Sequence, residues 1–479
     1  MTNTLTPPET EAALASYGSR TVAVEPGGVE FIPLSARHGR PRQLFWTWTS
    51  PNMEFATITV GILSVLVFGL TFWQAVVAIA VGSALGSISM GVLSSWGPGA
   101  GLPQMVLSRL GFGFFGNILP AGINAVVAGI GWFAVNSVSG ALALHALAPA
   151  VNAKLCLLIV VVLMLAIAFA GHNLVQAFER YAFPVLALVF VVGAVWVFAK
   201  AHPGTPAFTE PSFVGGTTGG FLLTVGAAFG YAAGWNPYAA DYTRYLPADS
   251  SRRAVGLSAA LGVFVSCVFL EVAGAAVVSA VSKPAVDPGV YTSVMPTWLG
   301  KLTLLAITIG AIAANALNVY SGSMSFMALG IRLPTTLARA AVAAVFCVIG
   351  FLVALTAIGD PANNYENFLL IISYWIGPWL GVSFADRLLH RRDTAGMWSA
   401  VASTRYQNWA GPIAMLLGIV LSIWLFSNQT KYTGVVPSHV PQFGDIAFFV
   451  GFLVSALAYA ALTPVLKPRG AAPLTDLPA

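Results

Sequence analysis

Long apolar segments alternate with short polar ones along almost the whole chain. A bilayer is crossed by about 20 apolar residues in a helix. Windows of that length predict twelve transmembrane helices, at residues 45–68, 71–93, 115–147, 155–173, 181–199, 217–240, 254–281, 298–326, 337–358, 364–386, 410–427 and 443–466. The pattern therefore predicts an all-α polytopic membrane protein.

The sixth predicted helix contains residues that weaken a helix where a membrane helix should be regular. Its end reads GYAAGWNPYAADYTRYLP at residues 230–247, and the relevant residues are Gly230, Gly234, Trp235, Asn236 and Pro237. Glycine and proline destabilise helix interiors. A bilayer tolerates irregular backbone only where protein or a water-filled cavity covers it. Such interruptions are typical of substrate sites in secondary transporters.

The first predicted helix is also interrupted, by Ser50, Pro51 and Asn52, and carries the polar candidates Thr57 and Thr59. Two interrupted helices five apart indicate two five-helix repeats of opposite topology, followed by two extra helices. We therefore expect a disordered cytoplasmic tail, a first repeat, an inverted second repeat, two additional helices and a cytoplasmic tail, at residues 1–44, 45–200, 217–387, 410–466 and 467–479.

Composition and charge support this interpretation. Hydrophobic residues make up 57% of the 479 residues and charged residues only 8%, whereas about a quarter of a soluble protein is charged. With a cytoplasmic N-terminus, only five of the 22 Lys and Arg residues fall outside: Lys154, Lys200, Lys283, Lys301 and Lys431. The positive-inside rule explains the net charge of +5 without a nucleic-acid partner. We expect a plasma-membrane protein with both termini cytoplasmic.

Candidate binding residues are the few aromatic and amide side chains within apolar segments. Trp132 and Asn136 lie four residues apart, one helical turn, so that an indole and an amide share a face. Trp235 and Asn236 supply a second such pair. In the eighth helix we favour a helix-to-helix contact for Asn315 and a binding role for Asn318.

Ionisable residues in apolar segments are functional candidates. Glu271 is the one carboxylate that we place clearly at depth, and Glu179 precedes the fifth helix. Either carboxylate could carry a coupling proton; for Glu179, a structural pair with a neighbouring basic residue is an equal alternative. For Asp241 we favour an ion pair with Arg244 at the helix end.

Enzymatic chemistry is not indicated. The six histidines and three cysteines show no metal or catalytic spacing, and no nucleotide-binding motif appears. We therefore expect no metal, no cofactor, no disulfide framework and no obligate protein partner. A channel or a non-transporting sensor is the alternative from a different class, although the sequence shows no repeated filter motif.

Three segments together resemble a known family. The runs GLPQMVLSRLGFG, NILPAGINAVVAGIGWFAVN and GWNPYAADYTRYLP are similar to hallmark segments of the nucleobase:cation symporter family, in its purine-cytosine permease branch. The resemblance covers roughly residues 30–466. It implies a LeuT-type fold of ten core helices in a 5+5 inverted repeat plus two C-terminal helices, and import of a nucleobase such as cytosine or a purine by alternating access.

The resemblance also implies roles for individual residues. Trp132 and Asn136 match the family's third-helix aromatic and amide, which stack on the ring and bond its edge. Trp235 matches the aromatic on the opposite face, Asn318 the eighth-helix amide, and Thr59 lies near a polar position of the first helix.

Coupling to a proton is favoured over coupling to sodium. Sodium-coupled members carry hydroxyl ligands about one turn before the eighth-helix amide, where this chain has Ile312, Ala313 and Ala314. We therefore expect proton symport with Glu179 and Glu271 as candidate carriers. The runner-up is a sodium-coupled carrier of allantoin, hydantoin or a vitamin-like ring.

Overall fold

In its described residues, the protein is a bundle of helices with one short hairpin. The computed structural model describes residues 28–168, 172–204, 214–331 and 336–471, apart from the side chains of residues 167–180, 182, 183 and 336–340. Within these residues, five helices are long and apolar enough to cross a membrane, and six shorter apolar helices accompany them. The chain is thus a polytopic helical membrane protein.

The elements of the first half of the chain end before residue 204. They are η1 (Leu34–Ala36), α2 (Gln43–Thr49), η2 (Ser50–Asn52), α3 (Phe55–Leu66), α4 (Phe72–Ser94), α5 (Gly97–Ala100), α6 (Gln104–Leu107), α7 (Arg109–Gly116), α8 (Ile118–Val126), η3 (Val127–Trp132), α9 (Phe133–Leu147), α10 (Ala153–Ala168) and α11 (His172–Lys200).

The second half contains the remaining helices and one short hairpin. Its elements are α12 (Gly216–Ala233), η5 (Asn236–Tyr238), α13 (Ala239–Thr243), α14 (Arg252–Ala280), α15 (Pro288–Thr292), α16 (Thr297–Met327), α17 (Thr336–Ala357), α18 (Pro361–His390), α19 (Thr394–Ala402), α20 (Ala410–Phe426), β1 (Asn428–Gln429), β2 (Tyr432–Thr433), α21 (Val435–His439), η6 (Pro441–Phe443) and α22 (Ala447–Leu462).

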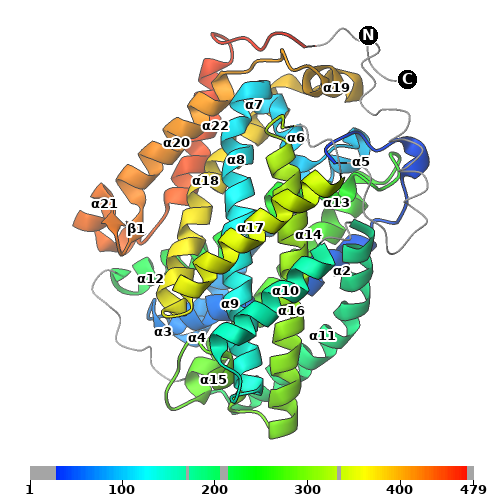
Figure 1. The fold of residues 1–479 in the computed structure, drawn as a ribbon. Coiled ribbons are helices and arrows are strands. Elements are labelled where there is room, and N and C mark those ends of the chain that lie inside the picture. The colour runs from blue at the N-terminus through cyan, green and yellow to red at the C-terminus, as the bar shows by residue number, and fades with distance from the viewer. Residues whose placement is uncertain (1–27, 169–171, 205–213, 332–335, 472–479) are drawn as a thin grey trace.

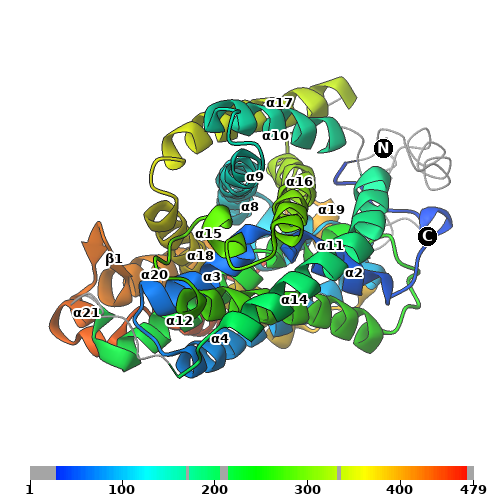
Figure 2. The same cartoon turned by 90° about the horizontal axis from the view of Figure 1, so that it is seen from below.

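The helices form two flanks around a central pair. α9 and α16 pack together in the middle, with α10 and α17 against them on one flank and α4, α12 and α14 on the other (Figure 2). α20 and α22 pack against α18 at the edge. The short helices α5, α6, α7 and α19 gather at one end of the bundle, and α15 lies at the opposite end (Figure 1).

Both predicted helix interruptions are confirmed, and they differ in geometry. Between η2 and α3, Met53 (φ −77°, ψ 68°) and Glu54 (φ −153°, ψ 176°) leave the helical region altogether. The second interruption is milder: α12 ends at Ala233, and the chain tightens into the 3-10 turn η5, which contains Pro237. A third irregularity, the π-helical segment η3, ends at Trp132 and was not predicted from the sequence.

Glycines bring the first interrupted helix into backbone contact with its neighbours. A Cβ atom at Gly61 would lie 1.6 Å from the carbonyl oxygen of Glu271, and one at Gly274 would lie 1.9 Å from the carbonyl oxygen of Ile58. At Gly310, a Cβ atom would lie 2.0 Å from the carbonyl oxygen of Met53. α3 is therefore fixed against α14, and its start against α16.

We predict that Gly61→Val destabilises the protein. The added atoms would collide with backbone, which cannot rotate away as a side chain can, so the cost should reach the upper part of the range of about 1–3 kcal/mol for overpacking. Thermal unfolding in detergent, followed by size-exclusion chromatography, measures the effect. Gly99→Ala is the control, because no atom lies within 4 Å of a Cβ at Gly99. Equal melting temperatures for the two variants would contradict the packing argument.

Candidate functional site

Trp132 lies in the centre of the bundle, at the junction of η3 and α9. Its ring makes edge-to-face contacts with Tyr231 on α12, at 5.6 Å between centroids, and with Phe368 on α18, at 5.1 Å. Trp132 is buried, with 6% of its surface exposed. A Cβ atom at Gly234 would lie 2.9 Å from the indole, so the glycine at the second interruption lets the indole approach the backbone.

A network of buried amides starts one turn after Trp132. Asn136 Nδ2 donates to Asn315 Oδ1 at 3.1 Å, and Asn318 Nδ2 donates to the same oxygen at 3.2 Å. Tyr238 donates its hydroxyl hydrogen to Asn318 Oδ1 at 3.0 Å. The network thus joins α9, α16 and the second interruption.

One acceptor of this network is unused. Within the described part of the chain, Asn136 Oδ1 is buried and has no hydrogen-bond donor. By contrast, the amide group of Asn315 forms its hydrogen bonds between helices. Its Nδ2 donates to Phe133 O at 2.9 Å and lies 3.2 Å from Ser137 Oγ. A buried oxygen without a donor is costly unless a ligand or water supplies one. Asn136 is therefore the network residue best placed to bind a ligand.

The second indole is held by the first interruption. Trp235 Nε1 donates to Asn52 Oδ1 at 2.8 Å, and its ring contacts Trp48 and Tyr238 at 5.8 Å and 5.7 Å between centroids. Tyr238 thereby links Trp235 to the amide network. The structure thus brings Trp132, Asn136, Asn318 and Trp235 into one connected region.

The other predicted substrate-binding residues lie apart from this region. Asn236 points to α4, where its Nδ2 donates to Ser89 Oγ at 2.6 Å. Thr59 donates to Phe55 O at 2.9 Å and lines a cavity beside the region. The side chains of Trp235 and Asn236 therefore point to different elements and do not form a combined site.

Of the two predicted coupling residues, only Glu271 has a described side chain. Glu271 Oε2 accepts a hydrogen bond from Ser83 on α4 at 2.9 Å, so this carboxylate is directed toward α4. Glu179 belongs to α11, but its side chain lies outside the described residues. Asp241 accepts a hydrogen bond from the backbone N–H of Gln104 at 2.8 Å.

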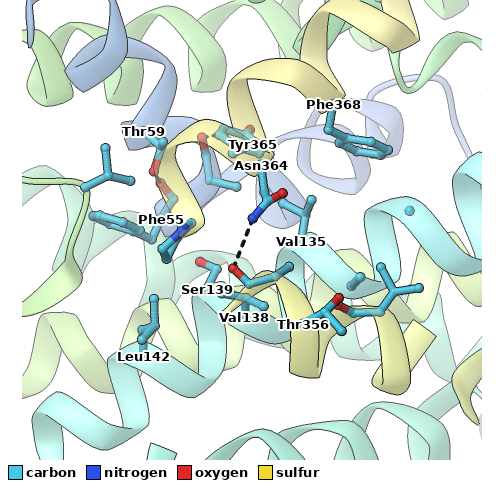
Figure 3. Close-up of a pocket in the computed structure, with 17 residues that line it drawn as sticks. Phe55, Thr59, Val135, Val138, Ser139, Leu142, Thr356, Asn364, Tyr365 and Phe368 are labelled. Atoms are coloured by element: carbon cyan, nitrogen blue, oxygen red, sulfur yellow. Dashed lines mark hydrogen bonds between the residues drawn. The ribbon is translucent and has the colours of Figure 1, made fainter. Parts of the chain in front are cut away.

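A cavity of about 210 Å³ lies beside the site, on the side of α15. Figure 3 shows part of its wall, which is mainly apolar with a few hydroxyl and amide groups. Its lining includes Phe55, Thr59, Val135, Ser139, Asn364 and Phe368. Since Phe368 also contacts Trp132, its ring lies between the cavity and the indole. The cavity therefore reaches the aromatic edge of the site.

Glu271 is not the only carboxylate at depth, contrary to our prediction. Glu54, in the first interruption, is 1% exposed. Its Oε2 accepts a hydrogen bond from Ser139 on α9 at 3.2 Å, and its Oε1 lies 3.4 Å from the hydroxyl of Tyr231. The available signal was its position two residues after Asn52, next to the predicted interruption of the first helix.

Several tyrosines were also missed. Tyr231 and Tyr238 are both buried and supply the hydroxyls that connect the second interruption to Glu54 and Asn318. Tyr365 on α18 donates to the carbonyl oxygen of Ala56 at 3.0 Å. For Tyr231 and Tyr238, the position in or beside the second interruption was the available signal; Tyr365 had no such signal.

Comparison with known proteins assigns the chain to a family. The family model described as "Permease for cytosine/purines, uracil, thiamine, allantoin" matches residues 31–451. The purine-cytosine permease fcyB of Emericella nidulans is 30% identical over 94% of this chain and 92% of its own length. The putative purine-cytosine permease YxlA of Bacillus subtilis is 28% identical over 93% of this chain and 97% of its own.

Solved structures share the fold. Mhp1, a nucleobase-cation-symport-1 family transporter, in a closed conformation with bromovinylhydantoin bound, has a TM-score of 0.68 at 18% identity, covering 90% of this chain and 93% of Mhp1. Its inward-facing conformation gives 0.69 at 17% identity, covering 93% and 94%. These relatives are permeases and transporters rather than enzymes. The chain therefore belongs to the nucleobase:cation symporter family, in its purine-cytosine permease branch.

Proposed function

We propose that this protein imports a nucleobase, cytosine or a purine, by proton symport through alternating access. The observation that carries the proposal is the buried, undonated Oδ1 of Asn136 one turn from the indole of Trp132. A nucleobase combines what these two groups need: a flat ring that stacks on an indole and a ring N–H that donates to an amide oxygen.

The relatives support this choice of substrate. Those at 30% and 28% identity are named purine-cytosine permeases, and each match spans more than nine-tenths of this chain. We propose that Trp132 and Trp235 flank the ring on its two faces and that Asn136 and Asn318 form hydrogen bonds with its edge. Thr59 lines the cavity that leads to the site. Asn236 would serve indirectly, by holding the second interruption against α4.

The face of α16 that packs against the first interruption lacks side-chain oxygens at three positions, which supports proton rather than sodium coupling. Gly310 packs against Met53 and Glu54 there, and Ala313 and Ala314 follow one turn later. None of the three side chains carries an oxygen, whereas sodium needs several oxygen ligands. Glu271 and Glu179 remain candidate carriers for the proton.

The proposed topology follows the order of the interrupted helices. We propose a 5+5 inverted repeat over residues 45–200 and 217–387, followed by two additional helices, with twelve spans in the plasma membrane. Arg109 and Arg387 lie at the end that holds α5, α6, α7 and α19, and Lys283 precedes α15. This distribution supports a cytoplasmic location for the arginine-rich end and for both termini.

A sodium-coupled carrier of a hydantoin, allantoin or a vitamin-like ring is the second candidate. It is favoured by the fold shared with the hydantoin-bound Mhp1 structure and by the uracil, thiamine and allantoin permeases within the family model. The two candidates differ in the coupling ion and in the edge of the ring that the amides bond.

We predict that Asn136→Ala abolishes uptake of radiolabelled cytosine and purines while membrane abundance stays unchanged. The variant loses the acceptor for the ring N–H, and a polar substrate group left unpaired costs about 1–3 kcal/mol. Asn363→Ala, at an exposed amide near the start of α18, is the control. Normal uptake by Asn136→Ala would remove α9 from the binding site.

Loss of ring stacking should be measurable at Trp132. Trp132→Leu should weaken binding by about 1–3 kcal/mol, the usual contribution of an aromatic ring stacked on a base. Trp132→Phe, which keeps an aromatic face, should weaken it less. Equilibrium binding to purified protein tests both variants; an affinity for Trp132→Leu within about twofold of wild type, or about 0.4 kcal/mol, would argue against stacking.

The coupling ion can be identified by uptake into cells in sodium-free buffer. Accumulation should persist there and should collapse when a protonophore dissipates the proton gradient. A valinomycin and potassium control, which changes the membrane potential alone, separates the electrical from the chemical component. Strict dependence on sodium would reject proton symport and favour the second candidate.

A further inference from the structure

Glu54 lies at the bend of the first interrupted helix, and the function proposed above does not use it. Its extended backbone places the side chain inside the bundle, where 1% of the residue is exposed. Ser139 on α9 donates to Oε2 at 3.2 Å. On α16, a Cβ atom at Gly310 would lie 3.0 Å from the Cβ of Glu54. The carboxylate therefore sits where the helices of the candidate site meet.

The titratable groups around Glu54 are acids, not bases. α12 contributes Tyr231, and α18 contributes Tyr365, which interacts electrostatically with Glu54 and also with Cys267 and Glu271 on α14. Among the described residues, no Lys, Arg or His is paired with Glu54. A carboxylate buried without a cation is costly in its ionised form, so a bound proton changes the stability of this region directly.

The hydrogen bonds of Tyr231 depend on the proton of Glu54. Thr57 Oγ lies 2.5 Å from Asn52 O and 2.5 Å from Tyr231 Oη. Because a carbonyl oxygen only accepts, the Thr57 hydrogen goes to Asn52, and Thr57 Oγ is left to accept. Tyr231 then has one hydrogen and two acceptors within reach, Thr57 Oγ and Glu54 Oε1 at 3.4 Å.

Thr57 and Glu54 compete for the hydroxyl hydrogen of Tyr231, and the protonation state of Glu54 determines which of them accepts it. Ionised Glu54 attracts the hydrogen of Tyr231, whereas protonated Glu54 supplies its own hydrogen and releases that of Tyr231 to Thr57. The ring of Tyr231 packs against Trp132. The protonation state of Glu54 is thereby connected both to the contact between α3 and α12 and to the proposed base site.

The cavity beside the site gives Glu54 a route to water. Its neighbour Phe55 and its hydrogen-bond donor Ser139 both line the cavity of about 210 Å³ (Figure 3). A proton therefore needs to pass only the Ser139 hydroxyl to reach Glu54 Oε2. Glu271, which is bonded to Ser83 on α4, does not line this cavity.

We infer that Glu54 carries the coupling proton and that Tyr231 transmits its protonation state to the base site. The inference rests on the proposed proton symport and names a carrier other than Glu179 and Glu271. With the cavity open, the carboxylate takes one proton from water on the α15 side and becomes neutral. After the site opens to the other side, the carboxyl group returns that proton to water there, and the carboxylate is restored.

The test compares exchange with accumulation in proteoliposomes, with radiolabelled cytosine as the probe. Glu54→Gln imitates the protonated state, so it should exchange labelled for unlabelled base at equal pH on both sides. It should fail to accumulate base when a pH gradient is imposed, ending at equal concentrations inside and outside. Glu366→Gln, the same change at another buried carboxylate, is the control and should still accumulate it. Glu271→Gln tests the rival carrier.

The outcomes separate this inference from the proposed function. If wild type exchanges base but a pH gradient drives no accumulation, proton symport itself fails. If Glu54→Gln accumulates like wild type, or Glu271→Gln alone loses accumulation, Glu54 is not the carrier. Loss of both binding and exchange by a folded Glu54→Gln would make Glu54 a substrate ligand and would also overturn the inference.

A second variant covers the case in which Glu54→Gln does not fold. Tyr231→Phe keeps the ring against Trp132 and removes only the hydroxyl. It should weaken the coupling of accumulation to the pH gradient and shift the dependence of uptake on external pH, because ionised Glu54 loses its tyrosine donor. An unchanged pH profile would overturn the role of Tyr231.

Discussion

Hydrogen bonds between the two interrupted helices are the constraint on which the rest of the structure depends. Asn52 accepts from Trp235 at 2.8 Å, and Thr57 lies 2.5 Å from the hydroxyl of Tyr231. Polar groups freed by an interruption within a bilayer must be satisfied inside the protein. Each interruption here supplies partners to the other, so the two form one unit that orients both indoles.

The amide network extends this unit into the centre of the bundle. Tyr238 links the second interruption to Asn318, and Asn315 connects Asn318 to Asn136. Most polar atoms of the network are satisfied internally, which makes it rigid. The undonated oxygen of Asn136 is the exception, and a site that keeps such an atom at a cost in stability is suited to bind a donor.

Much of the fold could be predicted because hydropathy determines where membrane helices lie. The predicted helices at 71–93 and 254–281 agree closely with α4 and α14. Trp132, Asn136 and Asn318 could be selected because aromatic and amide groups are rare in such helices. Asn236 could not be placed in this way: neighbouring residues on a helical backbone point in different directions, so Trp235 and Asn236 reach different helices.

Depth and irregular backbone were harder to predict than helices. Glu54 follows Pro51 and Asn52, and a linear sequence does not distinguish an interruption inside the membrane from a loop at its surface. The π-helical turn that ends at Trp132 depends on packing around it and has no local signature. Glu271 was correctly placed at depth, but the direction of its carboxylate depends on the contact between α14 and α4.

The central claim is that a buried amide oxygen beside an indole recognises a nucleobase ring that carries an N–H group. Competition for radiolabelled cytosine bound to the purified protein tests it most directly. Cytosine, adenine and hypoxanthine should displace the label, whereas caffeine, a purine whose ring nitrogens carry no hydrogen, should not. Displacement by caffeine as readily as by hypoxanthine, or by allantoin and hydantoins alone, would contradict the account.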